Sequence, residues 1–393
     1  MKLRTLRDAD VAGKRVLLRE DLNVPLKDGA ILDPKRIDAA LPTIRYLVEH
    51  NARVIVVSHL GRPDGRPNSK LTLKPIADAL SRRLHMDVTF ASDVVGPSAH
   101  EASETLRDGQ IAMLQNVRFE PGEERNDPQL AKHLAQLAQL YVNDAFGAAH
   151  RAHASTEGVT HYLPSFAGLL MEAEVNALSQ LLGDPAKPYV CVIGGAKIKD
   201  KVGVFTNLME RVTTFCIGGG MANTFLAAQG FDVGRSLRDD DLRPAVGVLE
   251  SARKNNVTLM LPIDAVVSDS VENDAGAHVV DIGDVGDRMI LDIGPKTAAM
   301  YAKAIESART VVFNGPMGVY EKTAYREGTR VVGDAMAAAT AHGAHTIVGG
   351  GDAAAAAETL GFAEKVTHVS TGGGATLEFL EGKSLPGIKA LEE

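Results

Sequence analysis

Short apolar runs alternate with longer amphipathic stretches along this chain, and this alternation restricts the folds available to it. Continuous Val, Ile and Leu runs bounded by polar or glycine-rich turns suit the strands of a parallel sheet covered on both faces. The amphipathic stretches between them suit the helices that cover it. The expected strands are Arg15–Leu18, Val54–Val57, Ile111–Leu114, Leu140–Val142, Tyr189–Ile193, Thr214–Ile217, Thr258–Leu261, Val311–Phe313 and Thr346–Val348.

The length of the chain predicts two domains, because 393 residues exceed what one hydrophobic core usually supports. We therefore expect an α/β protein with two Rossmann-like three-layer domains, each built on a parallel sheet. A stretch with helical spacing of apolar residues, Glu172–Leu182, ends at Gly183 and is followed by Asp184-Pro185 and Lys187-Pro188. Glycine and proline there are typical helix stops, so we interpret this stretch as a helix that connects the two domains.

Composition excludes several classes of protein. The net charge of -8 and the pI near 5.9 argue against non-specific binding to nucleic acid or to an anionic membrane. Cys191 and Cys216 lie in apolar runs and are expected to be buried, reduced thiols. The N-terminus lacks an apolar signal core, and no apolar run is long enough to span a bilayer. The sequence predicts a soluble, cytoplasmic protein.

The two halves of the chain differ in the residues that follow their strands. Of the 38 glycines, 27 follow residue 190 and only 11 precede it. Glycine clusters allow backbone amides to approach the phosphates of a nucleotide, whereas arginines bind a small phosphorylated acid bidentately. The glycine clusters are Gly194-Gly195, Gly218–Gly220, Asn314-Gly315-Pro316, Gly349–Gly351 and Gly372–Gly374, and the first half offers Arg36, His59, Arg62, Arg118 and Arg151. This division suggests an enzyme that moves a phosphoryl group.

The cluster Gly194-Gly195-Ala196-Lys197 and the following Lys201 do not form a Walker P-loop, which requires GxxxxGK[ST]. Two glycines at a strand end, with lysines at the start of a helix, still provide amides and ammonium groups for phosphates. The alternative is a glycine turn followed by solvated lysines. Lys197 and Lys201 are four residues apart and are expected to share a helix face.

The segment Gly349–Ala354 matches the loose dinucleotide fingerprint G-x-G-x-x-A, which raises the alternative of an NAD-dependent dehydrogenase. No acidic residue lies near the offset of about 20 residues at which that fingerprint reads the ribose. In another interpretation the loop amides bind phosphate and Asp352 binds Mg²⁺, an ion that commonly takes one or two carboxylates plus substrate phosphates. His150 and His153 are three residues apart, but no third ligand has matching spacing for a metal site.

Taken together, these motifs resemble the phosphoglycerate kinase family over essentially the whole chain. The segments that carry the resemblance are Arg19–Pro25, Ser58–Pro63, Leu114–Phe119, Asn143–Ser155, Gly194–Lys197, Phe313–Gly318, Gly349–Asp352 and Ser370–Ala375. The resemblance implies reversible phosphoryl transfer between 1,3-bisphosphoglycerate and MgADP, giving 3-phosphoglycerate and MgATP. It also implies a monomer.

Roles follow from the resemblance, position by position. The implied substrate residues are Asp21, Asn23, Arg36, His59, Arg62, Arg118 and Arg151. The implied nucleotide residues are Gly194, Gly195, Lys201, Gly218, Gly219, Asn314, Pro316, Glu321, Gly350, Gly351, Asp352 and Ala353, with Asp352 on Mg²⁺ and Glu321 on the ribose. Arg36, Lys197 and the amides of Gly351 and Gly373 are the implied catalytic groups.

The resemblance further implies that two half-sites are brought together by a hinge. The expected divisions are residues 1–172 for the phosphoglycerate-binding domain, 173–187 for the hinge helix and 188–378 for the MgADP/MgATP-binding domain. Residues 379–393 are expected to return to the first domain. A non-catalytic nucleotide-binding protein is the remaining alternative, distinguished by affinity without turnover.

Two positions depart from the family pattern. Glu20 is acidic where the family usually has an apolar or small residue, and in a strand its side chain should point away from that of Asp21. We therefore expect little effect on the substrate site. Ala353 stands where many members have Ser or Thr, so only its backbone amide is available to a phosphate.

Overall fold

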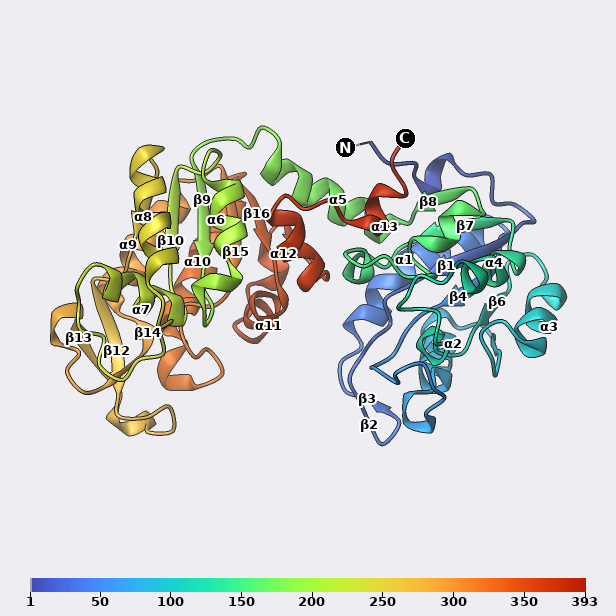
Figure 1. The fold of residues 1–393 in the computed structure, drawn as a ribbon, viewed down its shortest axis with the longest axis horizontal. Helices are drawn as coiled ribbons and strands as arrows, with labels where there is room; N and C mark the ends of the chain where they lie inside the picture. The colour runs from blue at the N-terminus through green and yellow to red at the C-terminus, as the bar shows by residue number, and fades with distance from the viewer. Residues whose placement is uncertain (1) are drawn as a thin grey trace. The chain divides into compact units, whose positions relative to one another are not determined.

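In the computed structural model, which describes residues 2–393, the chain divides into two compact units (Figure 1). The first unit runs from the N-terminus to Asn176 and takes up Ser384–Glu393, and the second is Ala177–Lys383. The division falls within helix α5 (Leu169–Leu182), so this helix carries the chain from the first unit into the second. Among the described residues, no helix combines the length and the apolar character needed to cross a membrane.

The first unit contains a six-stranded sheet in which every neighbouring pair is parallel. Buried runs of Val, Ile and Leu form its central strands, as expected for a sheet covered on both faces. In spatial order the strands are β5 (Val88–Phe90), β6 (Ile111–Met113), β4 (Arg53–Val57), β1 (Arg15–Arg19), β7 (Leu140–Asn143) and β8 (Ser165–Ala167). A short hairpin of β2 (Leu26–Lys27) and β3 (Ala30–Ile31) lies outside this sheet.

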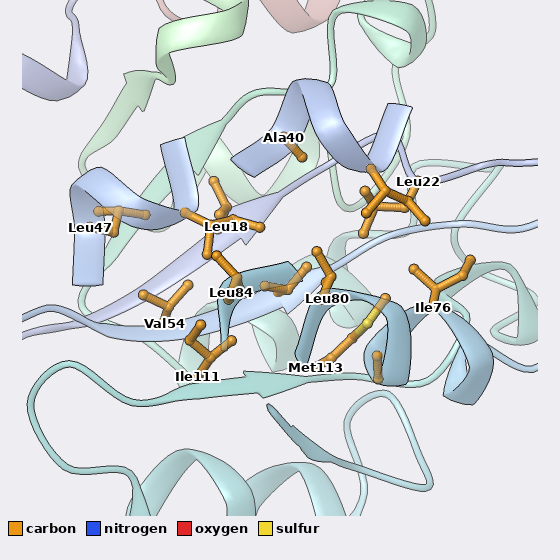
Figure 2. Packing of buried hydrophobic residues seen from close by; sticks show 14 of the residues in the cluster. Leu18, Leu22, Ala40, Leu47, Val54, Ile76, Leu80, Leu84, Ile111 and Met113 are labelled. Atoms are coloured by element: carbon orange, nitrogen blue, oxygen red, sulfur yellow. The ribbon is translucent and has the colours of Figure 1, made fainter. Parts of the chain in front are cut away.

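Alternate side chains along each strand of this unit enter different cores, because successive residues point to opposite faces. Val16 and Leu18 of β1 pack with helices α1 (Lys35–Glu49) and α2 (Lys74–Leu84), in the core drawn in Figure 2. Leu17 packs on the other face, with helices α3 (Pro97–Thr105) and α4 (Pro128–Gln136). These two layers fix the sheet so that its strand ends form a rigid edge.

The second unit repeats this plan with another six-stranded parallel sheet. Its strands, in spatial order, are β11 (Thr258–Met260), β10 (Thr214–Ile217), β9 (Tyr189–Ile193), β15 (Thr310–Asn314), β16 (His345–Val348) and β17 (His368–Val369). Its helices are α6 (Val202–Leu208), α7 (Gly219–Ala228), α8 (Arg243–Lys254), α9 (Pro295–Glu306), α10 (Glu327–Ala341), α11 (Gly351–Thr359) and α12 (Gly374–Leu380).

Helices cover this second sheet as well. Val190 and Phe313 pack in one core with residues of α9, α10 and α11. Phe205 of α6 lies with its ring centroid 5.0 Å from that of Phe215 in β10 and 5.7 Å from that of Phe225 in α7. A smaller antiparallel sheet of β13 (His278–Asp281), β12 (Asp264–Ser268) and β14 (Met289–Ile293) adds a separate apolar cluster.

The C-terminal segment packs on the first unit through backbone contacts. The Arg4 amide donates to the Leu391 carbonyl at 3.0 Å, and the Gly387 amide donates to the Ala149 carbonyl at 2.9 Å. The short helix α13 (Pro386–Lys389) lies in this segment. The residues of α12 remain with the second unit.

The α/β class with two parallel sheets is confirmed, and each strand expected from an apolar run is present to within about a residue at either end. The sequence did not reveal the antiparallel sheet, because its strands are short and partly exposed. One local expectation is wrong: Lys197 and Lys201 do not share an α-helix face. They flank the 3-10 helix η6 (Ile198–Asp200), and α6 begins only after Lys201.

Candidate active-site residues in the two units

In the first unit, the candidate substrate residues gather from one edge of the sheet. Carboxyl ends of parallel strands meet at one edge, and this edge is where open α/β sheets bind ligands. Asp21 and Asn23 follow β1, His59 and Arg62 follow β4, Arg118 lies in the 3-10 helix η3 (Val117–Phe119) after β6, Arg151 follows β7, and Arg36 lies in the first turn of α1.

Arg36 and Asp21 form an ion pair between α1 and the loop after β1. The Nη1 of Arg36 donates to both carboxylate oxygens of Asp21, at 2.7 and 2.8 Å. Helix α1 begins here after its N-cap residue Pro34, and Asp33 accepts a hydrogen bond from the Lys35 amide at 3.0 Å. The guanidinium is partly exposed, so it is held in place and still accessible to an anion.

A second set of contacts ties three loops together around Gly61. The Gly61 amide donates to Oδ1 of Asn23 at 2.9 Å, and Nη1 of Arg118 donates to the Gly61 carbonyl at 2.8 Å. Gly61 has a φ of +60°, a left-handed conformation that favours glycine. The loops after β1, β4 and β6 are therefore fixed relative to one another.

His59 is buried against Arg19, a residue that the sequence analysis did not assign to the site. Nη2 of Arg19 lies 3.1 Å from Nδ1 of His59, and Nε of Arg19 donates to the Ser155 hydroxyl at 2.8 Å. Arginine can only donate, so Nδ1 is the acceptor and the proton of the neutral ring is on Nε2. Burial and the neighbouring arginines hold the pKa of His59 well below its usual value.

Behind this pair, Glu123 accepts hydrogen bonds from the Ser155 amide at 2.9 Å and from its hydroxyl at 2.6 Å. Glu123 is fully buried, and burial raises its pKa. A signal for this support was present in the sequence: Arg19 is a charged residue at the end of an apolar strand. A buried arginine requires acceptors, which predicts a polar network next to it.

Arg62 and Arg151 are exposed, and Nε of Arg151 lies 3.1 Å from Nε2 of His150. They add positive charge to an edge where Arg36 and Arg118 are already present. An edge with this many guanidinium groups suits a small acid that carries a phosphate.

In the second unit, the candidate nucleotide residues surround a cavity of about 500 Å³. Its wall combines glycine-loop backbone with apolar side chains such as Leu237 and Met289. Of the predicted nucleotide residues, Gly195, Gly219, Pro316, Glu321 and Asp352 line it. An apolar slot with a few polar groups at its rim fits a purine base and its ribose.

The glycines at this cavity are required by close backbone contacts. A Cβ on Gly194 would lie 2.0 Å from the Pro316 carbonyl oxygen, and one on Gly218 would lie 2.9 Å from the Met317 Cα. The Gly219 amide donates to the Met317 carbonyl at 2.8 Å. The loops after β9, β10 and β15 thus interlock, which explains why Gly194 and Gly218 support the cavity from behind.

Lys201 and Asn314 connect this cavity to the loop after β16. Lys201 Nζ donates to Asn314 Oδ1, and Asn314 Nδ2 donates to the Gly349 carbonyl at 2.5 Å. Burial lowers the pKa of Lys201, while the carboxylate of Asp352 acts in the opposite direction. An ammonium group is therefore held beside the start of α11.

Helices α11 and α12 both begin after a glycine with a positive φ. Gly350 precedes α11 with a φ of +106°, and Gly373 precedes α12 with a φ of +52°. The first amides of a helix have no acceptor within the helix, so they are available to an anion. Gly351 and Asp352 are exposed at the start of α11, whereas the Ala353 side chain is buried.

Lys197 is also exposed, in an extended conformation directly before η6. Its loop is fixed by the Ile198 amide, which donates to the carboxylate of Asp239 at 2.9 Å.

The described residues contain no group of three or more His, Cys, Asp and Glu side chains suited to a metal. His150 and His153 therefore gain no third ligand. Asp352 provides one exposed carboxylate beside helix-start amides. This arrangement fits Mg²⁺, because that ion is usually held by one or two carboxylates, waters and substrate phosphates.

Asp292 is a cavity residue that the sequence analysis missed. Its side chain is buried and accepts hydrogen bonds from the amides of Gly328, at 2.7 Å, and Ile293, at 2.9 Å. Burial raises its pKa to about 8. Only its position directly before Ile293 at the end of an apolar run hinted at this placement.

The chain has two α/β units, each built on a parallel sheet, with arginines at the strand ends of one and glycine loops at the strand ends of the other. These features define a class of phosphate-handling α/β enzymes. The phosphoglycerate kinase family model matches residues 6–383, and the chain belongs to this family. The chain is accordingly a phosphotransferase. The NAD-dependent dehydrogenase suggested by Gly349–Ala354 gains no support.

Known phosphoglycerate kinases are similar to this chain over its full length. The chain is 52% identical to a phosphoglycerate kinase of Chloroflexus aurantiacus, covering all of both sequences. It is 53% identical to one of Moorella thermoacetica, covering 99% of each. The solved structure of phosphoglycerate kinase from Coxiella burnetii is similar, with 44% identity, a TM-score of 0.91 and coverage of 99% of this chain and 98% of that one. The Pyrococcus horikoshii OT3 enzyme has 34% identity, a TM-score of 0.85 and the same coverage.

Proposed function

We propose that this enzyme transfers a phosphoryl group directly between 1,3-bisphosphoglycerate and ADP, with the first unit binding the phosphoglycerate and the second the nucleotide. The observation that carries the proposal is the division of chemistry between the units. Guanidinium groups gather at the sheet edge of the first, and glycine-loop backbone surrounds a cavity of about 500 Å³ in the second.

In the first unit, Asp21, Asn23, His59, Arg62, Arg118 and Arg151 would bind the phosphoglycerate. The neutral His59 donates one hydrogen bond through Nε2 without adding charge. Asp21 orients Arg36 through the pair at 2.7 and 2.8 Å. Arg36 would then face the oxygens of the transferring group, because phosphoryl transfer depends mostly on positioning and on neutralising those oxygens.

In the second unit, the base site would be lined by Gly194, Gly195, Gly218, Gly219 and Pro316. Glu321 would bind the ribose. Lys201, Asn314 and the amides of Gly350, Gly351 and Ala353 would hold the phosphates, with Asp352 holding Mg²⁺. That ion, when bound, supplies charge neutralisation. Lys197 and the Gly351 and Gly373 amides would stabilise the transferring group.

Because the two half-sites belong to separate units, we infer that transfer requires domain closure, with helix α5 as the hinge. Closure would also exclude water, which otherwise hydrolyses an acyl phosphate. We further propose a cytoplasmic monomer, consistent with an acidic chain whose described part has no membrane-spanning helix.

The test is an assay of acyl phosphate formation from ATP and 3-phosphoglycerate, with and without Mg²⁺. Turnover that requires all three components is expected. Nucleotide binding without turnover by folded protein would favour a binding protein, and would contradict the proposal. Small-angle scattering should show a smaller radius of gyration with both substrates than with either one, and equal radii would contradict domain closure.

A further inference from the structure

Two buried carboxyl groups lie behind the substrate-binding edge of the first unit. Glu20 is 1% exposed and Asp144 is 0% exposed. Oε1 of Glu20 and Oδ2 of Asp144 are buried with no hydrogen-bond partner. A buried carboxylate oxygen without a donor is costly, so each of these oxygens requires an explanation.

The register of the sheet places the two groups next to each other. In the parallel pair of β1 and β7, Arg19 lies opposite Asn143. Glu20 directly follows Arg19, and Asp144 directly follows Asn143. The Asp144 amide continues the ladder by donating to the Arg19 carbonyl at 2.8 Å. Laterally paired residues of a parallel sheet project to the same face, so the carboxyl groups are neighbours.

Asp144 also holds the start of helix α5. Its Oδ1 accepts a hydrogen bond from the Met171 amide at 3.0 Å. A Cβ on Gly168 would lie 2.1 Å from the same oxygen, so glycine is needed for this close approach. Thr43 of α1 accepts a hydrogen bond from the Leu169 amide at 3.1 Å. The pair therefore lies where two strand ends meet the first turn of α5.

The surrounding charges do not neutralise two carboxylates. Arg19 is the nearby cation, but its guanidinium donates to Ser155 and to the main-chain oxygen of Glu20. Asp21 adds a further negative charge. Burial first, and then the charge of Asp144, raises the pKa of Glu20, and burial raises that of Asp144. A proton between the groups provides Oε1 of Glu20 with a partner and adds to the hydrogen bonds that Thr43, Met171 and Leu170 give to the Asp144 carboxyl.

We propose that Glu20 and Asp144 share one proton at neutral pH and act as a positioning pair that fixes the start of α5 to the strand ends carrying Asp21. The link to the reaction rests on the proposed function, but the shared proton does not. Glu20, which the sequence suggested would have little effect, thus supports both the substrate loop and the helix that leaves the unit.

Three variants test the pair: Glu20→Gln, whose amide can donate to Asp144 at every pH, Glu20→Val, which cannot, and Glu172→Gln as a matched control. Glu172 lies on α5 and pairs with Arg7 at 3.4 Å. Because burial raises the pKa of Asp292 to about 8, that carboxyl is also protonated at pH 7, and the pair is tested by a difference spectrum. The infrared spectrum of the wild-type protein minus that of Glu20→Gln should contain a protonated-carboxyl band that is absent when the spectrum of Glu172→Gln is subtracted instead. Carbon-13 labelling of Glu alone in the wild-type protein shifts a Glu20 band and leaves that of Asp292, which separates the two even if a variant fails to fold.

The sign of the pH effect follows from the raised pKa values. The native state holds a proton that the unfolded state has released, so stability falls as pH rises above the ordinary carboxyl range. The wild-type folding equilibrium constant should fall by up to about tenfold per pH unit relative to Glu20→Gln. At pH 8, Glu20→Val should lower that constant roughly 10-fold to 100-fold, because Asp144 loses its donor.

The pH dependence of kcat tests whether the pair positions the substrate loop that carries Asp21. The alkaline decline of kcat in the wild-type enzyme should move to higher pH in Glu20→Gln and to lower pH in Glu20→Val. An active wild-type enzyme whose protonated-carboxyl absorption equals that of Glu20→Gln, or whose stability has the same pH slope as that of Glu20→Gln, overturns the pair. A protein that has the band but forms no acyl phosphate contradicts the proposed function instead.

Discussion

Nη1 of Arg36 donates to both carboxylate oxygens of Asp21, at 2.7 and 2.8 Å. The ion pair uses only Nη1 of Arg36. It fixes the orientation of the guanidinium group, while Nη2 and Nε make no hydrogen bond with Asp21. A cation with a fixed orientation costs less to align at the moment of reaction than one on a free side chain. We therefore expect Asp21 to affect catalysis through the position of Arg36 as well as through any contact of its own.

Replacing Arg36 should reduce the rate of transfer much more than it reduces nucleotide affinity. Removal of an arginine that stabilises a transferring phosphoryl group costs on the order of 10³-fold in kcat. We expect Arg36→Ala to show a loss of this size in steady-state assays, with the Kd for ADP measured by calorimetry nearly unchanged. A collapse of ADP binding with kcat preserved would contradict this role.

Replacing Lys197 and Glu321 should separate rate from affinity within the second unit. Lys197 is exposed beside a glycine loop, so Lys197→Ala should lower kcat by on the order of 10²-fold. Glu321 lines the cavity, and Glu321→Ala should mainly raise the KM for ATP, by about tenfold. The two variants are compared in one assay at varied ATP, and an exchange of these effects would contradict the assignments.

The sequence predicted the fold through its strands. Runs such as Tyr189–Ile193 are wholly buried, and their unbroken apolar pattern can be read without the structure. The strands of the antiparallel sheet escaped prediction because they carry partly exposed and polar residues, as in His278–Asp281. Pairing between distant short strands is set by tertiary packing, which local sequence does not encode.

The candidate site residues could be proposed from the sequence, whereas most of the residues that support them could not. Lys197 stands in a recognisable segment next to a strand end, and Arg36 lies in the first turn of α1. Glu123 and Asp144 act through burial and through contacts with distant parts of the chain, such as Ser155 and Met171. Neither burial nor those contacts follow from spacing along the sequence.

Gly194 should tolerate no side chain, since its Cβ would lie 2.0 Å from the Pro316 carbonyl oxygen. We expect Gly194→Ala to cost about 1–3 kcal/mol of unfolding free energy and to weaken nucleotide binding, because the loops after β9 and β15 must separate. Gly247→Ala is the matched control: Gly247 lies in α8, and its Cβ would meet no atom within 4 Å.

The control should raise stability by about 0.5–1 kcal/mol, the usual gain of alanine over glycine inside a helix. Urea unfolding of both variants measures the difference. Equal stability of the two variants would show that the loops after β9 and β15 can move apart at little cost in free energy.

His59 should make the first unit less stable in mild acid. Burial, and then the positive charge of Arg19, lowers its pKa well below 6.5, so the native state keeps the ring neutral while the unfolded chain binds a proton. The contribution of His59 to stability is therefore fully present above about pH 6.5 and falls as pH decreases, by up to about 1.4 kcal/mol per pH unit for this one proton. His59→Gln, which can still accept from Arg19, should flatten the curve of unfolding free energy between pH 7 and 5. His133→Gln, at an exposed histidine of α4, should leave that curve unchanged. Parallel curves for the wild-type protein and His59→Gln would show that the native state binds the proton as readily as the unfolded chain, and that the Arg19 contact does not hold the ring neutral.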